Sequence, residues 1–276
     1  MHYNDIDWNE LWQEARRQKS WGKKNRQAWD SRAAGFARRN IDSEYAELFL
    51  QLLRPAPHWR VLDIGCGPGT LALPLAARVK SVTAIDFSAA MLHELEERAA
   101  QQGITNIVPI QASWTDDWQQ LAIPAHEVVI SSRSLSVFDL RRALEKMNSW
   151  ATEKVFIADR VGSGPFDPDL FAAVGRPFDP GPDFIFTVNL LYQLGIHPKI
   201  DYIELERTKT YASRDEALES CRWMFDDLSP AEEERLAAYV DGRLVHDEAG
   251  RVTLRRRARV KWALLSWDKE RVQGGL

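Results

Sequence analysis

Two acidic residues, Asp63 and Asp86, and the glycines between them are the residues whose types and spacing point most directly to ligand chemistry. The glycines Gly65, Gly67 and Gly69 directly follow an apolar run. Glycines let backbone amides approach a ligand, and the start of a following helix adds a positive dipole. The G-x-G-x-G spacing fits the G-x-G-x-x-G of dinucleotide sites poorly, and no Lys-Ser/Thr pair follows. A phosphate-cradling P-loop is therefore excluded.

The charges of the two acids favour a cationic ligand. Asp63 ends the first apolar run, where its carboxylate would repel a pyrophosphate and attract an ammonium or sulfonium group. Asp86 ends the next run, where a carboxylate can accept hydrogen bonds from both hydroxyls of a ribose. Together they predict a site for a nucleoside that carries an amino acid.

Three segments in this order, DIGCGPGT, AIDFSAAML and QASW, make the sequence resemble the class I S-adenosylmethionine-dependent methyltransferases, especially those that act on small molecules. The resemblance covers roughly residues 28–160 by motif and extends more loosely to 267. It implies S-adenosyl-L-methionine as cofactor and S-adenosyl-L-homocysteine as product. The cofactor-binding residues that it implies are Asp63, Gly65, Cys66, Gly67, Asp86, Phe87, Met91, Ala112, Ser113, Trp114 and Ser131.

The resemblance also distributes roles around the cofactor. Asp63 and the glycine loop surround the methionine portion, Asp86 holds the ribose, and Phe87 and Met91 pack on the adenine. The chain departs from the family after Ala112: where an acid is common it has Ser113, a weaker partner for the adenine amino group. Trp114 is either an adenine wall or ordinary core. Cys66 is expected to matter through its backbone, because no histidine partner is in view.

Two arginines, Arg133 and Arg160, follow the predicted fourth and fifth strands and are the candidate substrate residues. Guanidinium groups at that rim would orient a substrate carboxylate or phosphate. The alternative is that one or both pair with Asp139, Asp159 or Asp167. Methyl transfer from a sulfonium is an in-line displacement that positioning accelerates, so we name no catalytic base.

Short β-branched runs alternate with helical stretches, the pattern of a parallel sheet with crossover helices. The predicted strands are 59–65, 82–87, 106–112, 127–132, 154–160, 202–211 and about 252–267. Helices are predicted at 43–54, 68–78, 88–102, 138–150, 184–195 and 215–225, and from Ser229 as cap. Pro74 inside the second of these helices conflicts with its helical pattern. The fold class is doubly wound, Rossmann-like α/β, with the family order 3-2-1-4-5-7-6 for a seven-stranded, mainly parallel sheet.

An N-terminal helical arm, residues 1–42, precedes a methyltransferase domain at 43–276 with an insert at about 161–195. Residues 15–40 carry nine basic residues against Asp30, locally +8, so the rest of a chain of net charge -4 is about -12. Trp21, Trp29, Ala33 and Phe36 recur at near-helical spacing, which favours an amphipathic lid. The alternative is an RNA-binding arm, and Arg255, Arg257, Arg259 and Lys261 would add a basic strand face.

The rest of the composition indicates which kinds of protein and site are excluded. No apolar run is long enough for a membrane span, and the N-terminus lacks a signal-peptide core, which predicts a cytoplasmic protein without membrane partners. Two distant cysteines and six scattered histidines predict no metal site. We expect a methyltransferase acting on a small, anionic molecule; nucleic acid is a possible but disfavoured partner. The alternatives are an RNA or protein methyltransferase, and a noncatalytic regulator that binds the cofactor.

Overall fold

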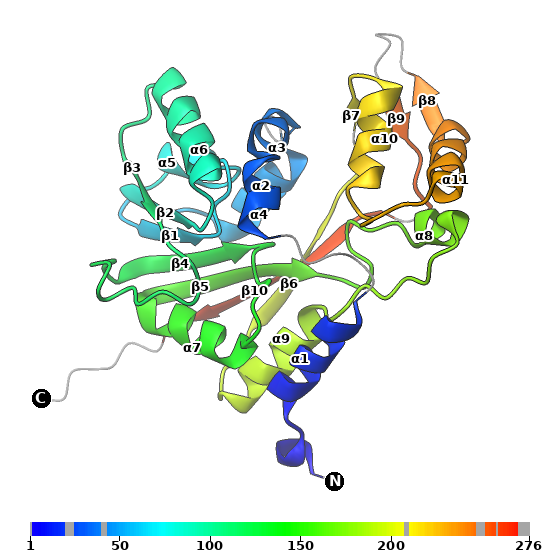
Figure 1. Cartoon of the computed structure of the whole chain (residues 1–276). Coiled ribbons are helices and arrows are strands. Elements are labelled where there is room, and N and C mark those ends of the chain that lie inside the picture. Colours follow the sequence, from blue (N-terminus) through cyan, green and yellow to red (C-terminus); the bar gives the residue numbers. More distant parts are fainter. Residues whose placement is uncertain are drawn as a thin grey trace, which may run out of the picture.

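A seven-stranded sheet with the order β3-β2-β1-β4-β5-β10-β6 forms the centre of the computed structural model (Figure 1). The structure describes residues 2–19, 25–39, 43–206, 210–246, 252–257 and 259–269. The strands are β1 (Arg60–Ile64), β2 (Ser81–Asp86), β3 (Ile107–Gln111), β4 (His126–Ser132), β5 (Ala151–Arg160), β6 (Lys199–Glu204) and β10 (Lys261–Asp268). β10 runs antiparallel to β5 and β6, and the other pairs are parallel. Since β10 is the seventh of these strands along the chain, the predicted order 3-2-1-4-5-7-6 is confirmed.

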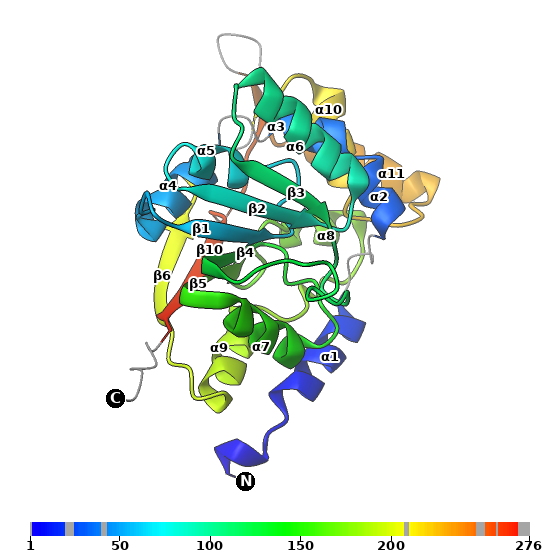
Figure 2. The ribbon, with the colours of Figure 1, turned by 90° about the vertical axis from the view of Figure 1, so that its left-hand side faces the viewer.

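Helices cover both faces of this sheet, which is why its inner strands are apolar on both sides (Figure 2). Val61 packs into the core on one face and Leu62 into the core on the other. The first face holds α4 (Glu44–Leu53), α5 (Ala72–Ala76) and α6 (Ala89–Gln101). The second holds α7 (Leu140–Trp150) and α9 (Phe184–Gln193). This arrangement leaves the carboxyl ends of the parallel strands together at one edge.

The conflict at Pro74 disappears because α5 begins later than the sequence predicts. The helix starts at Ala72, so Pro74 falls in its first turn. Amides of the first turn have no partner within the helix, and a proline there gives up no hydrogen bond.

A second, three-stranded sheet with the order β7-β9-β8 was missed by the sequence prediction. It consists of β7 (Thr210–Tyr211), β8 (Leu244–His246) and β9 (Val252–Leu254), and packs with α8 (Pro168–Val174), α10 (Arg214–Arg222) and α11 (Pro230–Asp241) around a core of its own. The predicted strands 202–211 and 252–267 are therefore wrong in extent. Each is two strands that pair in different sheets, and Arg255, Arg257 and Arg259 lie on the connector between β9 and β10. The helix predicted from Ser229 is confirmed, with Ser229 and Glu232 as a capping box.

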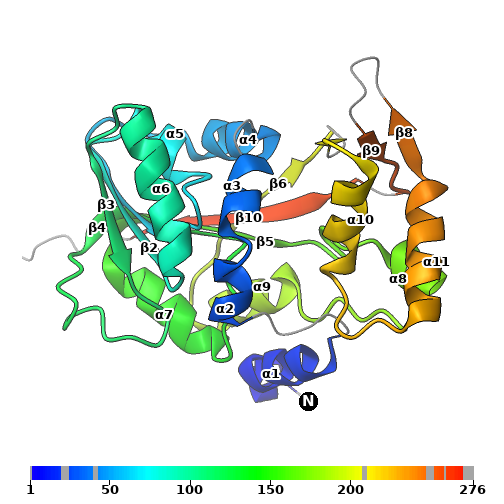
Figure 3. The same ribbon diagram turned by 45° about the horizontal axis from the view of Figure 1, so that its top comes forward.

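The N-terminal arm is divided into separate helices. A 3-10 turn (Tyr3–Asp5) leads into α1 (Trp8–Gln18), which packs against α7 and α9. Two short helices, α2 (Arg26–Asp30) and α3 (Ala33–Arg39), pack against α6 and stand between it and α10 (Figure 3). Trp29 and Trp223 make an edge contact at 6.0 Å, which ties the arm to the segment after α10. Trp21, Lys23 and Lys24 lie outside the described residues.

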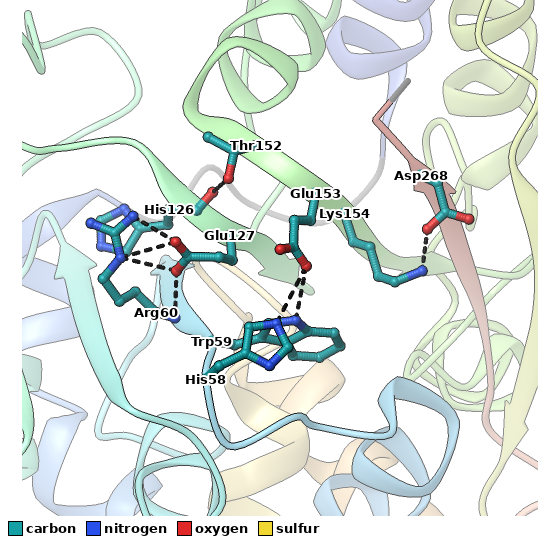
Figure 4. Close-up of polar contacts among 9 residues, drawn as sticks. All are labelled: His58, Trp59, Arg60, His126, Glu127, Thr152, Glu153, Lys154 and Asp268. Carbon is teal, nitrogen blue, oxygen red and sulfur yellow. Dashed lines mark hydrogen bonds and ion pairs between the residues drawn. The ribbon is translucent and has the colours of Figure 1, made fainter. Parts of the chain in front are cut away.

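A polar cluster at the opposite, amino-terminal edge of the sheet has its charges paired (Figure 4). Glu127 accepts hydrogen bonds from the Arg60 guanidinium, the shortest at 2.6 Å, and from its backbone amide at 2.8 Å. Glu153 accepts a hydrogen bond from Trp59 Nε1 at 3.1 Å. These contacts join the starts of β1, β4 and β5 to the segment before β1, so this edge is structural.

Candidate cofactor and substrate site

The ends of β1 and β2 place the two predicted acids side by side. Ile64 and Ile85 are register partners, so Asp63 and Asp86 leave neighbouring strands at the same edge. One oxygen of Asp86 accepts a hydrogen bond of 2.9 Å from the Gly67 amide. The amides of Gly65 and Cys66 donate to the Ile85 carbonyl at 2.8 and 3.0 Å. The glycine turn is thus fastened to the end of β2.

Gly65 and Gly67 are required for different reasons, although both adopt positive φ, at 69° and 54°. A Cβ on Gly65 would lie 2.4 Å from the Ser134 side chain. A Cβ on Gly67 would meet nothing within 4 Å. Gly65 makes room for the segment after β4, whereas Gly67 leaves its backbone open on the side where a ligand would approach.

Asp63 carries the electrostatic feature that fits S-adenosylmethionine. Its side chain is 2% exposed, and one carboxylate oxygen, Oδ2, has no hydrogen-bond partner among the described residues. Burial, together with the nearby charge of Asp86, raises the pKa of Asp63 to about 7, while Arg133 opposes the shift. A buried carboxylate without a donor is costly unless a ligand supplies one. The ammonium group of the cofactor's amino acid would do so.

Asp86 is preorganised by the start of α6 and by the arm. Its second oxygen accepts from the Ser88 amide at 2.9 Å, and the Ser88 hydroxyl in turn donates to Asp30 of α2. Burial raises the pKa of Asp86, against the lowering effect of these backbone donors. Asp30 reaches the site only through the packing of α2 on α6, so no local pattern marks it, whereas Ser88 follows Asp86 by two residues and lies at the start of α6.

The residues predicted around adenine lie after the ends of β2 and β3 and in the first turn of α6, with different accessibilities. Met91 and Ala112 are buried, at 3% and 4% exposure, while Phe87, Ser113 and Trp114 are half-buried. The indole of Trp114 donates to the Ser134 carbonyl at 3.1 Å and its ring packs on Trp118. Trp114 therefore joins the loop after β3 to the loop after β4.

Ser131, near the end of β4, and Cys66, in the glycine turn, both have side chains that contact protein. Ser131 is fully buried, and its hydroxyl bonds to the Ser134 hydroxyl at 2.7 Å, which donates to the Ile64 carbonyl at 2.6 Å. Burial raises the pKa of the Cys66 thiol well above its ordinary value, which suppresses the thiolate needed for nucleophilic chemistry. Both residues shape the loop that would hold the methionine portion.

Arg133 lies at the exit of β4, next to Asp63. Its guanidinium carbon is 4.1 Å from the centre of the Tyr45 ring and 5.7 Å from that of Trp262, and it makes no hydrogen bond or ion pair with any described residue. The surrounding protein lowers the pKa of Arg133, with Tyr45 and Asp63 opposing, yet the residue stays exposed to solvent. It is a positive charge at the carboxyl edge of the sheet, on an exposed residue whose guanidinium has no acceptor among the described residues.

Trp262 of β10, which the sequence analysis did not single out, adds a second free donor beside Arg133. It is 7% exposed, and its Nε1 has no partner among the described residues. A buried indole N–H without an acceptor is unusual.

Arg160, the other candidate, is engaged with the protein. It is 7% exposed, and its two terminal nitrogens donate to the carbonyls of Pro180 and Pro182. Gly164 packs so closely on the stem of Arg160 that a Cβ there would lie 2.1 Å from it. These contacts anchor the insert after β5 and use the donors that a substrate would need.

Comparison with known proteins agrees with this geometry. Residues 61–153 match the model of a family described as a methyltransferase domain. The chain is 32% identical over 247 residues to an uncharacterized protein of Haemophilus influenzae, covering 88% of this chain and 90% of that one. It is 29% identical to the aklanonic acid methyltransferase DauC of a Streptomyces species, over 60% of this chain and 73% of that one. Matches to 23S rRNA (uracil(1939)-C(5))-methyltransferases, such as that of Stenotrophomonas maltophilia, span 26% of this chain and 16% of theirs.

Among solved structures, a putative methyltransferase of Bacillus halodurans superposes with a TM-score of 0.55 at 15% identity, over 82% of this chain and 98% of that one, which bears on the fold. No helix in the described part of the chain is long and apolar enough to cross a membrane. The expected enzyme class and cofactor are confirmed. With its glycine turn, its two strand-end acids and the order of its sheet, the chain belongs to the class I methyltransferases, enzymes that use S-adenosyl-L-methionine.

Proposed function

We propose that this enzyme methylates a small molecule that carries an anionic group, and that Arg133 binds that group. The observation that carries the proposal is the unpaired Arg133 guanidinium at the exit of β4, beside Asp63. A ligand in an open α/β sheet lies off the carboxyl ends of the strands, where the order reverses between β1 and β4. An acceptor there meets Arg133 next to the cofactor's methionine portion.

The free indole N–H of Trp262 supports the same acceptor chemistry. Arg133 and Trp262 both offer donors, and no described residue supplies an acceptor to either group. A carboxylate or phosphate would accept from both and would be held in one orientation. Positioning of this kind is the main contribution needed for an in-line methyl transfer.

The backbone of Arg133 provides a further argument. Its φ is 60°, a left-handed conformation that costs a non-glycine residue about 1–2 kcal/mol. Such strain gathers at binding and catalytic sites, where position outweighs stability. The Arg133 amide donates to the Ala158 carbonyl at 2.9 Å, which holds the strained residue between β4 and β5.

We assign no catalytic base, so the acceptor must supply its own lone pair. Burial raises the pKa of Tyr45 to about 12, so its hydroxyl is protonated at neutral pH and bonds to Ser132 at 2.6 Å. His126 lies at the start of β4, the far end of the strand from Arg133. An acceptor that already carries a lone pair, such as a carboxylate or a neutral amine, needs no base.

A second candidate, methylation of RNA through the basic arm, has less support. Arg16 donates to the Ser136 carbonyl at 3.2 Å, Arg17 pairs with Glu14, and Arg32 stacks on Trp223 at 4.1 Å. These basic side chains are engaged within the protein, which favours the arm as a cover over the site.

The test follows a labelled methyl group into fractions of a metabolite extract separated by anion exchange. With wild-type enzyme we expect label in retained, anionic compounds. Arg133→Asn should lower this transfer at least tenfold and change the S-adenosylhomocysteine Kd less than twofold. Asparagine tolerates positive φ, so the variant removes the guanidinium while accommodating the backbone. Label in unretained compounds, or a large loss of cofactor affinity in Arg133→Asn, contradicts the proposal.

A further inference from the structure

A pocket of about 220 Å³ lies where the loop after β5 meets the connector between β9 and β10. Ser163, Gly164 and Phe166 line it from the loop, and Arg256, Arg257 and Arg259 line it from the connector. Trp262 of β10 is the register partner of Arg160 at the end of β5, so both segments leave the main sheet at its carboxyl edge. The pocket therefore opens on the same edge as Arg133 and is formed by other residues.

The two acids in the wall of this pocket already have partners. Asp167 accepts a hydrogen bond from the Tyr239 hydroxyl at 2.7 Å, and Asp169 pairs with Arg243 at 3.2 Å. The donors to these two carboxylates come from α11 and from Arg243, which follows it. The two carboxylates offset only part of the positive charge that the connector supplies.

The three connector arginines that line the pocket differ in the contacts that they already make. Arg256 donates to the Phe166 carbonyl at 2.5 Å and so closes one side of the pocket. Arg259 lies 3.8 Å from Glu204 and 3.7 Å from Glu206, both long ion pairs between exposed side chains. Arg257 is exposed and has no hydrogen-bond or ion-pair partner in the described part of the chain. At least one whole guanidinium is free to bind an anion.

We propose that this pocket binds a phosphate group of a small-molecule acceptor, as a second anion site beside Arg133. The proposal rests on the proposed function. Guanidinium groups match the geometry of phosphate oxygens, and several of them around one dianion compensate its charge. The volume is below the roughly 300 Å³ at which pockets for whole drug-sized ligands begin. It suits one group of an acceptor whose reacting atom lies toward Arg133.

An RNA backbone is the less favoured occupant. Glu204 and Glu206, on β6 and its continuation, lie within 4 Å of Arg259, and they would repel a polyanion that runs past the pocket. A single phosphate held at the arginines avoids these carboxylates.

The test measures binding of inorganic phosphate and pyrophosphate to protein saturated with S-adenosylhomocysteine. Arg257→Gln should raise the pyrophosphate Kd about tenfold, the loss expected for one charge-assisted contact. Arg255→Gln is the matched control, because Arg255 is exposed on the same connector and does not line the pocket; it should change the Kd less than twofold. Equal losses in the two variants, or no loss in Arg257→Gln, overturn the proposal.

A second binding experiment uses a single-stranded RNA of about 20 nucleotides. We expect no RNA binding that pyrophosphate displaces. RNA binding that falls steeply with salt and is abolished by Arg257→Gln would overturn the proposal in favour of a nucleic-acid face. The two failures are distinguishable: a wild-type protein that binds neither phosphate nor pyrophosphate but still transfers methyl groups to anionic compounds overturns the pocket alone, whereas transfer confined to unretained compounds overturns the proposed function.

Discussion

The Asp86 carboxylate and the Gly67 amide are joined by a hydrogen bond of 2.9 Å, so the acid expected to hold the ribose also fixes the glycine turn. The same carboxylate accepts from the Ser88 amide at the start of α6. One side chain therefore sets the position of the glycine loop and of the start of α6 together.

Replacement of Asp86 should weaken cofactor binding and also lower the stability of the fold. Asp86→Asn keeps one acceptor and loses the charge, so we expect the S-adenosylhomocysteine Kd to rise at least about tenfold, together with a lower Tm. Asp201→Asn is the control: it removes a carboxylate of β6 whose partner is the exposed Lys199, and both quantities should be nearly unchanged. Unaltered affinity in Asp86→Asn would show that this carboxylate does not hold the ribose.

Alanine at Gly67 and at Gly65 should have different consequences. Both substitutions strain a positive φ at a cost of about 1–2 kcal/mol. Only Gly65→Ala also drives a Cβ against Ser134, so its free energy of unfolding should fall further. Gly67→Ala should remain folded and lose cofactor affinity, because its methyl group occupies the open side of the turn. Urea denaturation and calorimetry check both, and wild-type affinity in Gly67→Ala contradicts this assignment.

Cofactor affinity should depend on pH through Asp63. Burial and the nearby Asp86 raise the pKa of Asp63 to about 7, so the free enzyme holds this carboxyl protonated below that pH. A cationic amino group needs the ionised form, and S-adenosylhomocysteine affinity should fall about tenfold for each pH unit below 7 and level off above it. Asp63→Asn should bind weakly with a flat profile. Equal wild-type affinity at pH 5.5 and 8 is the contrary result.

The ion pair at the opposite edge should affect stability and leave the cofactor site unchanged. The Arg60 hydrogen bond lowers the pKa of Glu127 to about 2 from an ordinary 4.5. A lowered acid pKa stabilises the folded state above the unfolded value, and this contribution is lost as pH falls from 4.5 toward 2. Because Arg60 is 40% exposed, we expect only about 1 kcal/mol. Glu127→Gln should lose this amount at pH 7 and little at pH 2.5; a constant difference contradicts the assignment.

The sequence was sufficient for features that local chemistry decides. Asp63 and Asp86 could be identified because each ends an apolar run. The alternation of strands and helices predicts the α/β class, and the family resemblance predicts the strand order that the structure has. Residues 202–211 have one continuous strand pattern, yet β6 ends at Glu204 and β7 begins at Thr210. The pattern predicts a strand and leaves its partner open, so the second sheet was missed.

Contacts between segments far apart in the chain could not be predicted from the sequence either. Asp30 meets Ser88, and Trp262 comes to lie beside Arg133, only after the arm and the last strand have packed. Arg160 and Arg133 follow adjacent strands in similar settings, and the carbonyls of Pro180 and Pro182 are what distinguish them. Such differences depend on tertiary packing and leave no local signal.

The most direct test of the cofactor site is an experimental structure with S-adenosylhomocysteine bound. The two ribose hydroxyls should lie within about 2.6–3.2 Å of the Asp86 carboxylate. The amino group should lie close to Asp63 Oδ2, directly or through one water. A ligand whose ribose contacts neither acid, or whose amino group lies away from β1, would contradict the account.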